Sequence, residues 1–115
     1  MQYMLLIAGD EAYVPDTAGT GPISPEFAAY TEALKKAGVW RGGDRLKTTH
    51  HAARVRVRDG KSVVLDGPYT DVKEQVGGYY LIEVPTMDEA IEWAVRSPAA
   101  KYATVDVRPF AEIPR

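Results

Sequence analysis

Residues 66–83 read DGPYTDVKEQVGGYYLIE, and this stretch decides the fold of the chain. Its second half, from Gly78 to Val84, alternates two sets of side chains: Tyr80, Ile82 and Val84 on one face, and Tyr79, Leu81 and Glu83 on the other. A strand with apolar residues on both faces is typical of a sheet that is covered on both sides. The sequence therefore predicts a central strand here, entered from an Asp-Gly-Pro turn and a short polar run.

The segments before this turn predict a strand and a helix. Residues 2–8 carry apolar side chains on both faces, as the central strand does. Ser24 and Pro25 form an N-cap and first-turn pair, and Gly38 is a natural C-terminal stop, so we expect an amphipathic helix between them. Residues 39–49 mix strand-forming residues with a Gly-Gly pair, and we expect an irregular segment with short strand pieces.

A β-hairpin is expected immediately before the Asp-Gly-Pro turn. Residues 53–58 alternate small apolar side chains with arginines, and residues 61–66 supply the returning strand. Asp59 and Gly60 between them are typical of a type I′ turn, in which both positions have positive φ. We expect the valine face of this hairpin to be buried and the arginine face to be solvated.

A second helix and a last strand follow the central strand. Thr86 and Glu89 form a capping box at the helix start, and Pro98 follows its end. The buried stripe of this helix is expected to consist of Met87, Ala90, Ile91, Ala94 and Val95. Residues 102–108 then predict the closing strand.

This order of elements predicts a single α+β domain over residues 1–115, a ferredoxin-like two-layer sandwich with an added β-hairpin. Two helices cover only one face of the sheet, yet two of the strands are apolar on both faces. A homodimer that packs sheet on sheet is the simplest way to cover the second face.

Residues 9–21 break all periodicity and predict a long surface loop that acts as a lid or rim. Asp10 and Glu11 follow directly from the end of the first strand, where side chains often face a cleft. A solvated acidic loop is the alternative interpretation.

The composition narrows the classes of function. The chain has 115 residues, 14 basic and 16 acidic, and no cysteine, which excludes thiol redox chemistry and cysteine zinc sites. We expect no cofactor, no direct nucleic-acid binding, no membrane span and no signal peptide, and therefore a cytoplasmic protein.

The polar run after the turn is the candidate catalytic site. Acidic and basic side chains in close proximity shift each other's proton affinity, which lets one site hold both an acid and a base. Acid, base or oxyanion-stabilising roles are predicted for Asp66, Tyr69, Asp71, Lys73 and Glu74. Ordinary turn chemistry is the alternative, with Asp66 in an Asx-turn and Asp71 capping a short helical turn.

A second set of residues is predicted to bind a ligand. Gly77 and Gly78 would let backbone approach a ligand closely, although a β-bulge explains them equally well. Tyr79 and Glu83 share one strand face and would project into a mostly apolar pocket if that face lines a cavity at the dimer interface; an edge position with Glu83 in solvent is the alternative. His50 is a candidate base or ligand contact, whereas a metal site is not expected, because His50 and its neighbour point to opposite faces.

Several motifs together resemble the DGPF family of the YCII-related superfamily. They are the DGPYTDVKEQVGGYYLIE stretch itself, VRVRDGK at 55–61, DEAIEWA at 88–94 and VDVRPF at 105–110. The resemblance implies a dimeric α+β barrel, an association of some members with extracytoplasmic-function sigma factors, and a His–Asp pair in suspected enzymes of the superfamily. Phe27 and Ser97-Pro98 stand where that pair is expected, so the dyad is not carried over to this chain.

Two hypotheses of function follow. The first is a homodimer that binds a small molecule in a cleft near residues 66–83, with acid–base catalysis there. The second is a non-enzymatic accessory module whose exposed turn contacts a protein partner such as a sigma factor. An enclosed polar cluster would favour the first and an exposed one the second.

Overall fold

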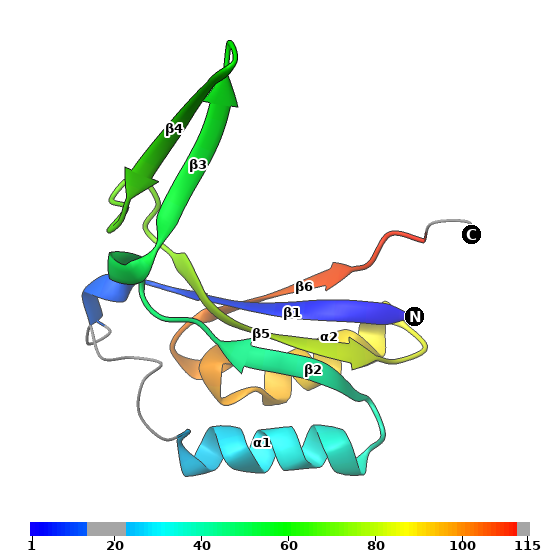
Figure 1. Ribbon diagram of the computed structural model, residues 1–115. Helices are drawn as coiled ribbons and strands as arrows, with labels where there is room; N and C mark the ends of the chain where they lie inside the picture. Colours follow the sequence, from blue (N-terminus) through cyan, green and yellow to red (C-terminus); the bar gives the residue numbers. More distant parts are fainter. Residues whose placement is uncertain (14–22, 113–115) are drawn as a thin grey trace.

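The computed structural model describes residues 1–13 and 23–112, so most of the predicted lid loop lies outside the described residues. Six strands, two α-helices and three short 3₁₀ turns follow one another along the chain (Figure 1). Their order is β1 (Gln2–Gly9), η1 (Glu11–Tyr13), α1 (Pro25–Lys36), β2 (Trp40–Arg45), η2 (Thr49–His51), β3 (Ala53–Arg58), β4 (Lys61–Asp66), β5 (Gln75–Glu83), α2 (Met87–Arg96), η3 (Pro98–Lys101) and β6 (Thr104–Pro109).

Four of the strands form an antiparallel sheet in the order β2-β5-β1-β6, and both helices lie on one side of it (Figure 1). The strand predicted to be central, β5, pairs with β1 on one side and with β2 on the other. The predicted ferredoxin-like α+β fold with an inserted hairpin is confirmed.

The helices begin at the predicted caps. The Ser24 side chain accepts a hydrogen bond from the backbone N–H of Phe27, and the Thr86 side chain accepts one from that of Glu89. The core between helices and sheet is built from one face of β1 and β5 and from the inner faces of both helices. Its buried members are Tyr3, Leu5, Tyr30, Leu34, Tyr80, Ile82, Val84, Ala90 and Ala94.

The stripe predicted for α2 is only partly buried. Ala90 and Ala94 face the sheet, but Met87, Ile91 and Val95 are 37%, 45% and 72% exposed. Apolar residues line both sides of this helix, and its alanines fix the buried side because they allow the closest approach to the sheet. The predicted burial of the three larger residues is wrong for the single chain.

Residues 40–45 form one continuous strand where we expected short pieces. The Gly-Gly pair explains the difference: a Cβ on Gly43 would lie 2.7 Å from the backbone oxygen of Tyr79. A side chain there would push β2 away from β5, so the glycine permits the pairing that it seemed to interrupt.

The β3–β4 hairpin forms a separate two-stranded sheet that rises on the side of the main sheet opposite the helices (Figure 1). Asp59 and Gly60 have φ angles of 52° and 73°, which confirms the predicted turn. The predicted burial of the valine face is wrong, since Val55 and Val57 are 62% and 59% exposed. Strand alternation shows which residues share a face, but not whether anything covers that face.

Candidate functional site

The Asp-Gly-Pro turn fastens the hairpin to the rest of the chain. The peptide bond between Gly67 and Pro68 is cis, and the N–H of Gly67 donates to the backbone oxygen of Ala52 at 2.9 Å. Gly67 packs so closely against Thr49 that an added Cβ would overlap the Thr49 carbonyl. The turn therefore has a structural role that only glycine can fill at this position.

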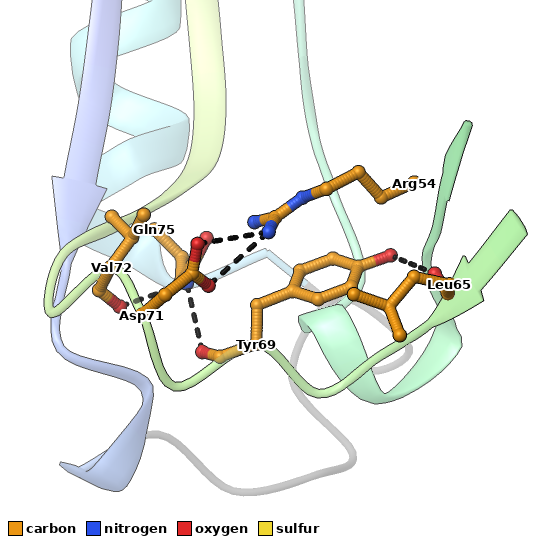
Figure 2. A network of polar contacts seen from close by, with 6 residues as sticks. All are labelled: Arg54, Leu65, Tyr69, Asp71, Val72 and Gln75. Carbon is orange, nitrogen blue, oxygen red and sulfur yellow. Dashed lines mark hydrogen bonds and ion pairs between the residues drawn. The ribbon is translucent and has the colours of Figure 1, made fainter. Parts of the chain in front are cut away.

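A polar network follows the turn and is centred on Arg54 of β3 (Figure 2). The Arg54 guanidinium donates to both oxygens of Asp71, at 3.0 and 3.2 Å, and lies 3.9 Å from the centre of the Tyr69 ring. The Tyr69 hydroxyl donates to the backbone oxygen of Leu65 at 2.9 Å. The Gln75 side chain donates to backbone oxygens of the same loop. The network holds residues 66–75 against one face of the hairpin.

This network fixes the charge of Asp71. The hydrogen bond from Arg54 is the main cause that lowers the pKa of the Asp71 carboxyl, and the charges of Arg54 and Arg56 act in the same direction. Asp71 therefore stays an ion-paired carboxylate at neutral pH, which suits an anchoring role better than proton transfer.

The other predicted catalytic residues lie along the same exposed segment. The carboxylate of Glu74 accepts a hydrogen bond from the Thr104 hydroxyl at 2.9 Å, which joins the loop to β6. Asp66 ends β4 opposite Ala53, and Asp66, Lys73 and Glu74 are all exposed. A small hollow of about 450 Å³ adjoins this segment, between Pro68, Tyr69 and the arginine side of the hairpin. A catalytic role for the five residues stays a prediction.

A larger cavity of about 1150 Å³ lies between α1 and the sheet, at the end where β1 finishes and β5 begins. Phe27 and Thr31 of α1 line it, together with Ile7, Trp40 and Tyr80 of the sheet. The Trp40 and Tyr80 rings meet edge to face, with centroids 6.0 Å apart, and burial raises the pKa of the Tyr80 phenol. The wall is thus mainly apolar and aromatic, with a neutral phenol at pH 7.

Polar and charged residues also line this cavity. They come from three segments: Asp10 and Glu11 after β1, Asp44 and Arg45 at the end of β2, and Lys47 and Thr48 before η2. Asp10 and Glu11 thus line the cavity, in agreement with the first of the two interpretations of that segment. Apolar walls combined with a few polar groups are typical of small-molecule sites.

Glu11 also links the cavity to the hairpin base. Its carboxylate accepts hydrogen bonds from the backbone N–H of Thr49, at 2.7 Å, and from the Thr49 hydroxyl. Nδ1 of His50 lies 3.3 Å from the hydroxyl oxygen of Thr48, a cavity-lining residue. His50 is thus placed next to the cavity wall, although it does not line the cavity itself.

The structure places the residues predicted to bind a ligand at two separate locations. Gly77, Gly78 and Tyr79 line the large cavity, and Gly77 is the extra residue of a β-bulge between β5 and β1. Glu83 lies at the opposite end of β5, where it pairs with Arg41 at 2.8 Å. It takes no part in this cavity.

Sequence reasoning missed the aromatic wall, because Phe27, Trp40, Tyr80 and Tyr102 belong to four separate segments. One feature of the sequence pointed to this aromatic wall. Phe27 stands where the resemblance would place the histidine of the superfamily's suspected enzymes, and the structure places Phe27 in the cavity wall. A phenylalanine there offers contact area but no proton transfer.

Among the residues that the structure places, no group of three His, Asp or Glu side chains gathers closely enough to hold a metal ion. Within residues 1–13 and 23–112, neither α-helix is long and apolar enough to cross a bilayer.

The sheet order, the two helices on one face and the inserted hairpin define a small ferredoxin-like α+β protein. The YCII-related domain matches residues 1–113, so the chain belongs to the YCII-related family, which includes the DGPF proteins that its motifs resemble. An uncharacterised protein of Rhizobium meliloti (strain 1021) is 41% identical over 84 residues, which cover 71% of this chain. The match spans 64% of that relative's length.

Proposed function

We propose that this chain binds a small, largely apolar molecule with a polar head in the cavity between α1 and the sheet. The observation that carries the proposal is the cavity of about 1150 Å³, with its aromatic wall and its polar groups. Its volume is slightly above the roughly 300–1,000 Å³ usual for ligand pockets. Phe27, Trp40 and Tyr80 would contact the body of the ligand, and the charged residues its head.

The proposed activity is binding, and no reaction step is assigned. Asp71 is held as an ion-paired carboxylate, and Tyr69 and Glu74 hydrogen-bond within the fold. Acid–base chemistry by the 66–74 segment has less support than binding in the cavity, because the segment lies outside the larger cavity.

A cavity-filling variant tests the proposal. Thr31→Trp places an indole in the cavity, and Glu32→Trp adds the same ring one residue along α1, where the side chain is 76% exposed. Aromatic and heteroaromatic acids and amines would be screened by thermal shift. A ligand at about 100 times its Kd stabilises the fold by about 2.7 kcal/mol. Compounds that stabilise the wild type and Glu32→Trp should not stabilise Thr31→Trp.

Two results would contradict the cavity proposal. One is a broad library without a single stabilising compound for the wild type. The other is a set of compounds that stabilise Thr31→Trp as well as they stabilise Glu32→Trp. Circular dichroism of both variants ensures that the comparison is made between folded proteins.

We also propose that the chain works as a homodimer in the cytoplasm. The sheet face opposite the core carries Met4, Leu6 and Leu81, all partly exposed. No helix of the described chain covers this face, and a second sheet of the same kind would. Sedimentation measures the state directly, and a monomer at every soluble concentration would rule the dimer out.

An accessory role is the second candidate, favoured by the exposure of the polar segment from Asp66 to Glu74. In this role the segment contacts a protein partner such as an extracytoplasmic-function sigma factor. Lys73→Glu should weaken binding to such a factor, and Lys101→Glu, an exposed charge reversal on η3, should not. Equal binding by both variants would remove the segment from the interface.

A further inference from the structure

The β3–β4 hairpin, residues 53–66, is here named the arm, and its two faces differ in chemistry. Cross-strand pairs share a face, and Val55 pairs with Val64 and Val57 with Ser62. These four residues form the apolar face, together with Ala53 and its partner Asp66 at the base of the arm. The opposite, basic face carries Arg54, Arg56, Arg58, Lys61, Val63 and Leu65.

The chain contacts its own arm near the base of the basic face, where Val63 and Leu65 are still 54% and 52% exposed. Arg54 of that face meets Tyr69 and Asp71 of the following loop (Figure 2). On the apolar face, Val55, Val57 and Val64 are 62%, 59% and 61% exposed. Three neighbouring valines on one flat hairpin form a continuous apolar surface, which soluble proteins usually keep for contact with a partner.

The arm is nevertheless anchored at its base. The Gly67–Ala52 hydrogen bond, the fit of Gly67 on Thr49 and the Arg54–Asp71 pair all join it to the body of the chain. An isolated two-stranded hairpin is marginally stable in water, so its exposed length calls for packing from outside the single chain.

The area of the uncovered surfaces indicates what that partner is. Four strands about 4.8 Å apart and about six residues long give the uncovered sheet face a footprint of roughly 400 Å². One face of the arm adds roughly 200 Å², so the two uncovered surfaces together supply roughly 600 Å² per copy. This sum approaches the roughly 800 Å² per copy of a standard stable interface, whereas the sheet face alone supplies about half.

The distribution of charge along the chain also favours a second copy as the partner of the arm. The arm carries four basic and two acidic side chains, whereas the rest of the chain carries ten basic and fourteen acidic ones. The arm is thus positive and the body that a second copy would present is negative. This complementarity steers the arm of one copy toward the body of another.

We propose that the arm packs its apolar face on the body of a second copy of this chain, and that the exchange is reciprocal. The inference rests on the homodimer of the proposed function and adds the element that clasps it. It does not depend on ligand binding, so failure of the cavity proposal leaves it intact.

Neighbouring residues of β4 provide a matched test. Val64 and Val63 are 61% and 54% exposed, but Val64 lies on the apolar face and Val63 on the basic face. Val64→Asp should raise the dimer dissociation constant by roughly 100-fold, because twofold symmetry places the new charge in two contacts. Val63→Asp should stay within about threefold of the wild type, as surface substitutions away from a contact do.

Sedimentation velocity decides between the outcomes. A wild type that remains monomeric would overturn the proposal together with the dimer. A Val64→Asp variant that dimerises as tightly as the wild type would overturn the role of the arm alone.

A second measurement distinguishes a dimer in which the arms are docked on the partner from a dimer that packs through its sheets alone. The chain has no cysteine, so Ser62→Cys puts a single thiol on the apolar face and Lys61→Cys one on the basic face. When about nine tenths of the chains are dimeric, iodoacetamide should modify Ser62→Cys about tenfold more slowly than at dilution. Lys61→Cys should react equally fast at both concentrations. Equal rates for Ser62→Cys would show that the arm stays free and would overturn the proposal.

Discussion

The body of the molecule and the arm are built from similar residues, yet their environments are opposite. In the body, Leu5, Leu34 and Ile82 have no exposed surface, whereas in the arm Val55, Val57 and Val64 are more than half exposed. Both regions have correct strand alternation and correct turns. The difference teaches that a sequence pattern can specify an element completely without specifying what covers it.

Among the substitutions that test this difference between body and arm, the largest loss of stability is expected in the body. Leu34→Ala leaves a void between α1 and the sheet, so the free energy of unfolding should fall by about 3 kcal/mol. Urea denaturation measures the change. A loss below about 1 kcal/mol would show that the body is packed no better than the arm.

The second-largest effect is expected at Gly67, where the arm joins the body. Gly67→Ala forces a methyl group against the Thr49 carbonyl. The rearrangement that relieves this clash should lower the free energy of unfolding by about 2 kcal/mol. Hydrogen exchange should locate the change, with faster exchange in β3 and β4 and unchanged exchange in β1 and β5. Uniformly faster exchange would mean that joint and body unfold as one unit.

A much smaller effect is expected within the arm. In a monomeric Val64→Asp background, Val57→Ala should change the free energy of unfolding by less than about 0.5 kcal/mol, because Val57 is 59% exposed. Urea denaturation of the single and double variants gives the difference. A loss as large as that of Leu34→Ala would remove the distinction between the regions.

The smallest effect concerns Asp71 at the arm base. Because its pKa is lowered in the folded state, its ion pair stabilises the fold above the ordinary aspartate pKa of about 3.9, and this contribution is lost as pH falls through the folded value. Carbon-13 NMR should give a midpoint below about 3.9, which Arg54→Gln should raise. An unchanged midpoint in Arg54→Gln would remove Arg54 as the cause. The Asp71 side chain is 63% exposed, so the effect on unfolding is small.

Local sequence signals predicted most of the fold. The Ser24 and Thr86 caps, the Asp59-Gly60 turn and the alternation of β5 each depend on neighbouring residues, and each is found as expected. The burial of Val55 and Val95 was mispredicted, because periodicity defines a face without saying what covers it.

The cavity was harder to predict than the fold. Its aromatic wall brings together side chains from α1, β2, β5 and the segment before β6, so no single stretch reveals it. The sequence instead predicted a site in the polar run from Asp66 to Glu74, whose residues are close together along the chain. In the structure, Tyr69, Asp71 and Glu74 of that run mainly hold the arm in place.

The contact between Glu11 and Thr49 connects the two proposed sites. Glu11 lines the cavity, and Thr49, which it holds by two hydrogen bonds, is the residue on which Gly67 rests at the arm base. A ligand that draws Glu11 away from Thr49 therefore changes the support of the arm. Under the two proposals, docking of the arm changes the affinity of the cavity by the same factor, because coupling between two sites is reciprocal. One carboxylate would then couple ligand binding in the cavity to self-association.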